Sequence, residues 1–386
     1  MSLIRLPATW MRGGTSKGLF LDPADLPSDP TRRDALLLRA LGSPDPYGTQ
    51  IDGVGGATSS TSKVALVSPS TRPGYDLDYR FGAVAVNAAL IDWSGNCGNL
   101  SAAVAGFALS RGMLPPPPDG IASFRIWQAN LAETLIAHVP VRNAQALESG
   151  DFTLAGVAFP SARITVDFLA PGGSATLLPT GHPHDRLVVP GVGTFDATLI
   201  NAGNPTVLVR AADLGLSGRE SRATLNQDAA LLARCEAIRA HGAVAMGLAS
   251  TADAATTQRP HTPKLALIAP PLSYRASDGH EVAADSIDLS ARILSMGVLH
   301  HAFTATGAVA LAVAAVLPDT LAWEASGGRI ANGAELRIGH TAGVMAVGAS
   351  VAMCDGRWQA EKVTLWRSAR RLMEGWILVP DPDDPA

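Results

Sequence analysis

Lysine, cysteine and long apolar runs are all scarce in this 386-residue chain. Only four of its 30 basic residues are lysine, no segment is rich in lysine and arginine, and the net charge is −4. These features argue against a nucleic-acid partner. The longest apolar run, 307–317, is well short of the roughly 18 residues that a membrane span needs, so we expect no contact with a membrane.

Cofactor and disulfide motifs are missing as well. The three cysteines are widely spaced and odd in number, which excludes a disulfide framework and fits a reducing cytoplasm; they are Cys97, Cys235 and Cys354. No CxxC, HExxH, Walker or GxGxxG motif occurs, so neither a metal nor a nucleotide cofactor is expected. His182 and His184 stand in GHPHD, which we interpret as an ordinary polar loop. The N-terminus has no apolar signal segment, which again favours the cytoplasm.

The pattern of apolar residues predicts a mixed α/β chain of two domains. Hydrophobic residues make up 47% of the sequence, enough for a sizeable core. Alternation predicts strands, and 3.6-residue spacing predicts amphipathic helices. The strands are expected at 76–81 and 193–203, and the helices at 29–41, with Asp29 as N-cap and Pro30 as its first residue, at 226–240 and at 285–296. Cys235 and Cys354 fall in such patterns and are expected in the core.

Two further segments, 100–109 and 308–317, are apolar on nearly all faces and predict one buried helix in each half. A loop of glycine, threonine, asparagine or cysteine precedes each of them. This repetition suggests two pseudo-symmetric domains, each a sheet wrapped around its buried helix. The expected limits are 1–185 and 186–364, with about 365–386 packing on the first domain. The N-termini of the two helices would be ready anion sites.

Lys63 and Cys97 are the candidate catalytic residues. Lysine is rare here, yet two of the four lysines end the same tripeptide, Thr-Ser-Lys, at 15–17 and 61–63. Arginine cannot deprotonate in a protein, whereas the pKa of a buried lysine can fall until its amine acts as a base. Cys97 stands directly before the buried helix at 100–109, where a thiol is a competent acid or base.

Six motifs together give the chain a resemblance to a known family. MRGGTSKG, GGATSSTSK, NCGNLSAAV, LINAGNPTV, HTPK and SARRLMEGW resemble the PrpF family of 2-methylaconitate cis–trans isomerases, in register from about residue 5 to about residue 380. The resemblance implies two domains of the diaminopimelate epimerase-like fold, with the active site in a cleft between them. It also implies catalysis without a cofactor, with Lys63 as the base and Cys97 as the partner acid/base or a close neighbour of the substrate.

The resemblance further implies a small unsaturated di- or tricarboxylate as substrate. The expected binding residues are Thr15, Ser16, Lys17, Ser60, Thr61, Ser62, Gly98, Asn99, Asn204, Arg292, Thr306 and Gly307, with no metal ligand among them. A homodimer and a functional pairing with an aconitase-like dehydratase are also expected.

One position departs from the epimerase pattern. Epimerases of this fold place a second cysteine before the second buried helix, and here the sequence has Thr304 in FTATGA. A threonine hydroxyl is too weak an acid to replace a thiol, which disfavours a two-base racemase. The alternatives that stay open are 4-oxalomesaconate tautomerase, 3-methylitaconate isomerase, and a non-catalytic polycarboxylate-binding accessory protein of an iron–sulfur dehydratase.

Overall fold

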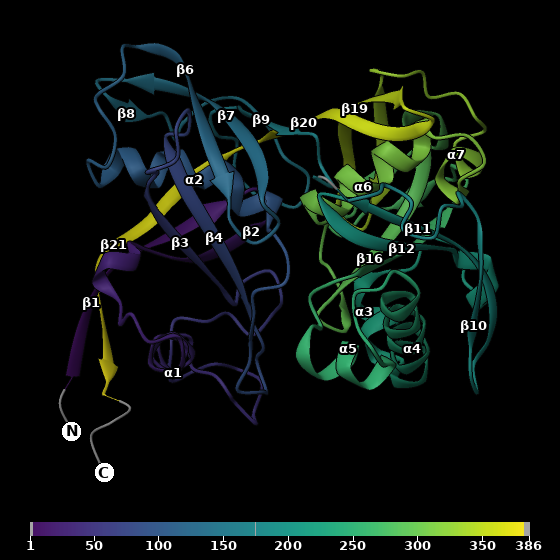
Figure 1. Cartoon of the computed structure of the whole chain (residues 1–386), viewed down its shortest axis with the longest axis horizontal. Helices are drawn as coiled ribbons and strands as arrows, with labels where there is room; N and C mark the ends of the chain where they lie inside the picture. The colour runs from purple at the N-terminus through teal and green to yellow at the C-terminus, as the bar shows by residue number, and fades with distance from the viewer. Residues whose placement is uncertain (1–2, 174, 382–386) are drawn as a thin grey trace. The chain divides into compact units, whose positions relative to one another are not determined.

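The computed structural model describes residues 3–173 and 175–381, which form two compact units. Unit 1 comprises Met1–Thr153, Phe159–Val166 and Arg367–Ala386, and unit 2 comprises Leu154–Ala158 and Asp167–Trp366. The division into folding domains at 185/186 and 364/365 stays a prediction. Strand β21, near the C-terminus, pairs with β1 inside unit 1 (Figure 1).

Unit 1 is a sheet that encloses one helix. Strands β1 and β2 form an antiparallel hairpin, β3 runs parallel to β2, and β4 is antiparallel to β3. Helix α2 packs against β1, β2, β3 and β7, whereas α1 packs on the other face of the first strands (Figure 1). The elements are β1 (Leu3–Gly13), β2 (Ser16–Leu21), α1 (Pro30–Leu41), β3 (Lys63–Pro69), β4 (Leu77–Val84), β5 (Ile91–Asp92), α2 (Gly98–Ser110), β6 (Gly120–Gln128), β7 (Glu133–Arg142), β8 (Gln145–Ala146) and β21 (Ala369–Pro380).

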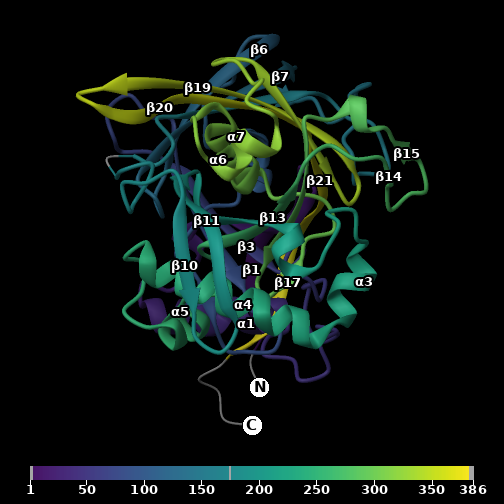
Figure 2. The ribbon, with the colours of Figure 1, turned by 90° about the vertical axis from the view of Figure 1, so that its right-hand side faces the viewer.

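Unit 2 repeats this plan. Strands β11 and β12 form an antiparallel hairpin, β13 runs parallel to β12, and helix α6 packs against β11, β12 and β19. Figure 2 shows α4 and α6 on opposite faces of these strands. The strands are β10 (Asp185–Val189), β11 (Gly193–Ala202), β12 (Asn204–Arg210), β13 (Lys264–Ala269), β14 (Tyr274–Arg275), β15 (Glu281–Val282), β16 (Leu289–Ser295), β17 (Val298–Leu299), β18 (Glu335–His340), β19 (Gly343–Cys354) and β20 (Arg357–Arg367); β9 (Ile164–Leu169) connects the two units. The helices are α3 (Arg222–Gln227), α4 (Ala229–Ala245), α5 (Ala252–Gln258), α6 (Ala305–Val316) and α7 (Leu321–Ala325).

The two buried helices are as the sequence predicted. Every residue of α6 from its start at Ala305 to Ala315 is buried, and α2 has only Gly106 and Ser110 partly exposed. The same order of elements, a hairpin, a parallel third strand and an enclosed helix, occurs in both units. The predicted pair of pseudo-symmetric α/β domains is confirmed in this respect.

The start of α1 also follows its sequence. The side chain of Asp29 accepts a hydrogen bond from the Arg32 N–H at 2.8 Å, and Pro30 is the first helical residue. The helix ends at Gly42, whose φ of 76° is a left-handed conformation that favours glycine. The predicted N-cap, Asp29, and the predicted first helical residue, Pro30, are therefore confirmed.

The helix predicted at 285–296 is wrong, because this segment contains strand β16. All residues of β16 are buried, with one face against the core that contains α4 and the other toward α6. A strand buried on both faces lacks the alternation of polar and apolar residues that identifies a half-buried strand. Its sequence pattern can therefore be mistaken for that of a helix.

Two smaller predictions are also corrected. The helix predicted at 226–240 is broken at Asp228, and α4 runs past Gly242 to Ala245. Gly242 lies inside the helix, where a larger side chain would collide with Val207. Cys235 lies in the core, where burial raises the pKa of its thiol to about 12. Cys354 does not lie in the core, because it stands exposed at the end of β19.

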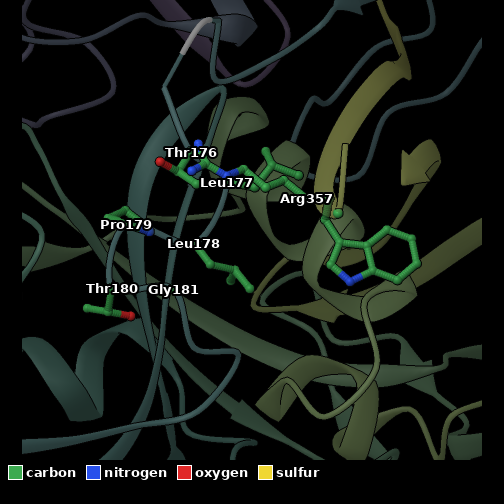
Figure 3. A pocket seen from close by; sticks show the side chains of 9 residues that line it. Thr176, Leu177, Leu178, Pro179, Thr180, Gly181 and Arg357 are labelled. Atoms are coloured by element: carbon green, nitrogen blue, oxygen red, sulfur yellow. The ribbon is translucent and has the colours of Figure 1, made fainter. Parts of the chain in front are cut away.

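Unit 2 also carries a surface hollow of about 470 Å³. Figure 3 shows the segment 176–181 on one side of it and Arg357, the first residue of β20, on another. None of the expected site residues lines this hollow. Among residues 3–173 and 175–381, no helix is both long and apolar enough to cross a bilayer, and no three histidine, cysteine or carboxylate side chains gather as metal ligands would.

Asp228 accounts for the break between α3 and α4, because its side chain accepts a hydrogen bond from the Leu231 N–H at 2.9 Å. Asp228→Ala should therefore lower the free energy of unfolding by about 1 kcal/mol, the usual cost of losing an N-cap. Asp228→Ser, which keeps an acceptor, should lose much less. Urea unfolding followed by circular dichroism measures both, and equal stability of Asp228→Ala and the wild type would contradict this assignment.

Candidate active site

The two Thr-Ser-Lys tripeptides lie side by side in unit 1. The N–H of Lys17 donates to the Ser60 carbonyl at 3.0 Å, and β2 and β3 then continue in parallel. Val64 and Leu66 of β3 point into the core beneath α1. Because side chains alternate along a strand, Lys63 points to the opposite face, toward α2.

The Lys63 amine lies in an apolar setting beside a thiol. Lys63 is 4% exposed, and its Nζ lies 4.9 Å from the centre of the Phe81 ring. Burial lowers the pKa of Lys63, and the charge of Cys97 and a hydrogen bond to its thiol oppose this change only in part. A lysine whose pKa is lowered holds more free amine near neutral pH, and free amine is what a carbon base requires.

Cys97 is the N-cap residue of α2 and is 7% exposed. Its side chain makes no capping hydrogen bond, so it does not accept from the first N–H groups of α2, which begin at Gly98. Its carbonyl accepts hydrogen bonds from Ser101 Oγ at 3.2 Å and Tyr79 Oη at 3.5 Å. Burial and the negative charge of Cys97 raise the pKa of Tyr79 well above its usual range, which keeps this phenol neutral.

Arg367 is a member of this site that sequence reasoning missed. Its side chain is fully buried; desolvation lowers the pKa of the guanidinium to about 10, and the charge of Cys97 partly opposes this. Arg367 therefore places a buried guanidinium within electrostatic range of the thiol. The sequence does not distinguish Arg367 from other arginines, because arginine supplies 26 of the 30 basic residues. The only sequence feature near it is the adjacent SARRLMEGW motif.

The glycine-rich turn between β1 and β2 rests directly on the start of α2. A side chain at Gly13 or Gly14 would collide with Asn99, so only glycine lets the turn come this close. Asn99 Nδ2 donates to Thr15 Oγ1 at 3.1 Å, and both side chains are buried. Asn99 thus anchors the turn. The N-cap position of α2 itself is taken by Cys97.

The hydroxyl-rich segment before Lys63 is internally bonded. Ser62 Oγ donates to Gln50 Oε1 at 2.5 Å, and the Thr58 hydroxyl bonds those of Ser60 at 2.9 Å and Thr61 at 2.8 Å. Ser60 and Ser62 are buried, and Thr61 is half-buried. These bonds fix the chain that leads into Lys63. Ser16, also buried, pairs with Gly13 across the turn.

The structure does not bring Lys17 to this cluster. Its neighbour Gly18 faces Lys63 and α2, so Lys17 points to the other face of β2. There its Nζ lies 5.9 Å from the centre of the Trp10 ring. Its role as a carboxylate ligand stays a prediction.

In unit 2, Asn204, Thr306 and Gly307 gather at the start of α6. Asn204 Nδ2 donates to Thr306 Oγ1 at 2.9 Å, as Asn99 does to Thr15 in unit 1. Thr304 is the N-cap of α6, and its hydroxyl accepts a hydrogen bond from the Gly307 N–H at 3.2 Å. The residue in the place of the second thiol thus caps its helix, unlike Cys97.

In β16, Ile293 faces α6, because a side chain at Gly307 of that helix would collide with it. Side chains alternate along a strand, so Arg292 lies on the opposite face, away from α6. Its guanidinium donates to the carbonyls of Glu220 at 2.9 Å and Ala291 at 3.0 Å, and burial lowers its pKa. The structure therefore separates Arg292 from Asn204, Thr306 and Gly307. Its predicted contact with substrate stays a prediction.

Comparison with known proteins agrees with these features. The family described as "PrpF protein" matches residues 3–380. The chain belongs to the PrpF family. A PrpF relative from Shewanella oneidensis, named 2-methyl-aconitate isomerase, is 49% identical over 391 residues, which cover 98% of each chain.

Two solved structures are similar along nearly the whole PrpF chain. One is a methylitaconate-delta-isomerase, with a TM-score of 0.75 and 36% identity, covering 98% of this chain and 96% of that one. The other is a hydroxyproline epimerase from Agrobacterium vitis, with a TM-score of 0.55 and 14% identity, covering 98% and 94%. The second likeness concerns the fold alone, and it confirms the predicted epimerase-like fold.

The contact between Lys63 and Cys97 can be tested by titration. Because the thiol holds the pKa of Lys63 up, Cys97→Ala should lower that pKa further, whereas Cys235→Ala should leave it unchanged. With only four lysines, NMR of lysine-labelled protein resolves the titration, and Lys63→Arg assigns the signal. A higher pKa of Lys63 in Cys97→Ala would contradict the assigned contact.

Proposed function

We propose that this chain is a cofactor-independent isomerase that interconverts the cis and trans forms of 2-methylaconitate by moving an allylic proton. The observation that carries the proposal is the Lys63 amine, buried with a lowered pKa beside Cys97 at the start of α2. The relative with 49% identity, named 2-methyl-aconitate isomerase, supports this substrate over the methylitaconate of the less similar structure.

Lys63 would act as the carbon base. Its neutral amine takes a proton from the CH₂ group next to the double bond, and the electron pair of that C–H bond spreads through the double bond into a carboxylate. The former double bond now has single-bond character and rotates. The Lys63 ammonium then returns the proton to the same carbon, so that no atom is gained or lost and the double bond re-forms in the other geometry.

The positive groups around Cys97 would stabilise the negative charge that develops on the substrate when the proton leaves. The first N–H groups of α2 carry the positive end of the helix dipole, and Arg367 is a buried cation. Fixed donors and charges in a site without water lower the cost of forming an enolate. Cys97 would hold the substrate or exchange a proton with Lys63.

Unit 2 offers no second thiol at the start of α6, because Thr304 stands there and its hydroxyl caps the helix. Inversion of a saturated carbon needs an acid and a base on opposite sides, whereas allylic isomerisation needs one base that gives its proton back. This difference favours the isomerase over a two-base racemase. It follows that saturated chiral acids should keep their optical activity in the presence of the protein.

The proposal extends to the setting of the enzyme. We place it in the cytoplasm, in propionate breakdown through methylcitrate, where an aconitase-like dehydratase would handle the same unsaturated tricarboxylate. A homodimer remains part of this proposal.

Kinetics of Lys63→Met test the function directly. With 2-methyl-cis-aconitate as substrate, followed by NMR, this variant should lose about 10²- to 10⁴-fold in kcat, the usual contribution of a general base. Lys362→Met is the matched control, because Lys362 is half exposed and its Nζ lies 4.0 Å from Asp167 Oδ2, its ion-pair partner.

The control variant should keep wild-type kcat and KM. Wild-type protein that binds the tricarboxylate without converting it would favour the accessory-protein alternative and would overturn the proposed isomerase. Near-wild-type turnover in Lys63→Met would remove Lys63 from the mechanism.

A further inference from the structure

Unit 1 carries a small pocket on the face of its sheet that is turned away from α2. Within β4, Tyr79 and Phe81 are buried toward α2, where the Tyr79 hydroxyl contacts the Cys97 carbonyl. Because side chains alternate along a strand, Asp78 and Arg80 point to the opposite face, on which α1 packs. The pocket there has a volume of about 240 Å³. Strand β4 thus stands between this pocket and the candidate active site.

Several groups that line the pocket can donate hydrogen bonds. Arg80 comes from β4, Ser68 from β3, Arg33 from α1, and Ser28 from the loop before α1. Among the described residues of the lining, Asp78 alone is acidic, and it pairs directly with Ser68 across the sheet. The lining therefore brings two arginines and two hydroxyls together with one carboxylate.

The charge of Asp78 is matched by partners outside the pocket. Its Oδ1 accepts a hydrogen bond from Ser70 Oγ at 2.7 Å and lies 4.0 Å from Arg72 Nε. Neither partner belongs to the lining. Asp78 therefore has a cation of its own and is not the counterion of Arg33 and Arg80.

Arg33 and Arg80 share a different counterion, Asp34. Arg33 donates to Asp34 Oδ1 from Nε at 2.8 Å and from Nη2 at 2.7 Å. The other oxygen of Asp34 accepts from Trp93 Nε1 at 3.0 Å. Both guanidinium groups lie over the Trp93 ring, that of Arg33 at 4.9 Å and that of Arg80 at 4.7 Å from its centre. Two positive groups are thus held near one carboxylate that is already fully bonded.

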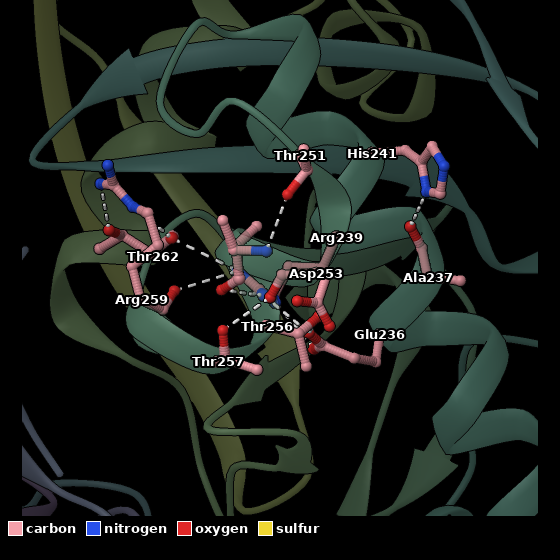
Figure 4. A network of polar contacts seen from close by, with 12 residues as sticks. Glu236, Ala237, Arg239, His241, Thr251, Asp253, Thr256, Thr257, Arg259 and Thr262 are labelled. Atoms are coloured by element: carbon pink, nitrogen blue, oxygen red, sulfur yellow. Dashed lines mark hydrogen bonds and ion pairs between the residues drawn. The ribbon is translucent and has the colours of Figure 1, made fainter.

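Arg80 keeps its hydrogen-bond donors available. Its guanidinium makes no hydrogen bond and no ion pair with the part of the chain that the structure describes. Burial and the charge of Arg33 lower the pKa of Arg80, and Asp34 opposes this change only in part. Arg239 of unit 2 is a contrast, because Figure 4 shows its guanidinium bonded to Glu236 and to backbone carbonyls. An oxyanion in the pocket would give Arg80 the partner that Arg239 finds within the protein.

We propose that this pocket binds a small oxyanion, either a phosphate or a compact dicarboxylate, between Arg33 and Arg80. The planar guanidinium of Arg80 presents a fork of N–H donors that matches two oxygens of such a group. The anion would offset the repulsion between the two arginines, and the hydroxyls of Ser28 and Ser68 would supply uncharged donors.

The size of the pocket limits the ligand. Pockets for drug-sized molecules start at about 300 Å³, so this smaller volume favours a compact anion over a nucleotide. The inference does not depend on the proposed isomerase activity, and it gives the arginines no part in that reaction.

NMR of protein with isotopically labelled arginine tests the site, with inorganic phosphate and succinate as probes. Sodium chloride keeps the ionic strength constant, so that general screening does not change. The Nε–H signals are assigned by their loss in Arg33→Lys, Arg80→Lys and Arg5→Lys. Phosphate should shift the signals of Arg33 and Arg80 with a common Kd. The Arg5 signal should stay in place, because Arg5 also stacks on a tryptophan, Trp376 at 5.0 Å, but does not line this pocket.

Variants then show whether Arg80 holds the anion. Arg80→Gln should weaken phosphate binding by about 10-fold, the size of one hydrogen bond to a charged group, as followed at the Arg33 signal. Arg80→Lys keeps the charge but loses the fork, and its Kd should lie between those of Arg80→Gln and the wild type. Arg5→Gln is the matched control and should leave the Kd unchanged. Thermal unfolding shows whether each variant is folded, and Arg80→Lys carries the comparison if Arg80→Gln is not.

The two probes identify the kind of oxyanion. Shifts with phosphate alone would support a phosphate site, and shifts with succinate alone would support a dicarboxylate site. Shifts with both would support a site for small oxyanions in general. Signals of Arg33 and Arg80 that stay in place with both probes would overturn the proposal. An unchanged Kd for phosphate in Arg80→Gln would overturn it too, because the anion would then be held by other groups.

Discussion

The amine of Lys63 is buried beside the start of a buried helix, and the proposed chemistry depends on this placement. Strand β3 begins at Lys63 and points it toward α2, while the glycine-rich turn closes on the same helix through Asn99. Burial lowers the pKa of Lys63, which favours the free amine, and Cys97 opposes this change in part. An exposed lysine at this position would remain protonated near neutral pH and could not take a proton from carbon.

The two units share a plan and differ in the groups that the plan presents. Both place a lysine at the start of the third strand and an amide side chain bonded near the start of the enclosed helix. Cys97 leaves its helix without a side-chain cap, whereas the Thr304 hydroxyl caps the other. In the proposed reaction, the Lys63 amine and the Cys97 thiol of the first unit are the reacting groups.

The sequence predicted the parts of the fold whose signals are local. The buried helices and the capping of α1 by Asp29 follow from short patterns. The pairing of Lys63 with Cys97 was expected from the resemblance to the family, and their catalytic roles stay predictions. It failed at β16, because a strand buried on both faces has no alternation, and at Arg367, which reaches the thiol only through the pairing of β21 with β1. The face on which Lys17 lies likewise depends on the register of the β1–β2 hairpin.

Conversion of 2-methyl-cis-aconitate in D₂O tests the central claim most directly. If Lys63 takes the allylic proton and returns one, its ammonium exchanges with solvent in some turnovers, and deuterium should enter the CH₂ carbon of the product. NMR should show deuterium there and none in the methyl group. In D₂O the free amine of Lys63 carries two deuterons before it takes the substrate proton, so its ammonium can return deuterium to the carbon. An isomerised product that carries no deuterium at any carbon would contradict the account of Lys63 as a carbon base.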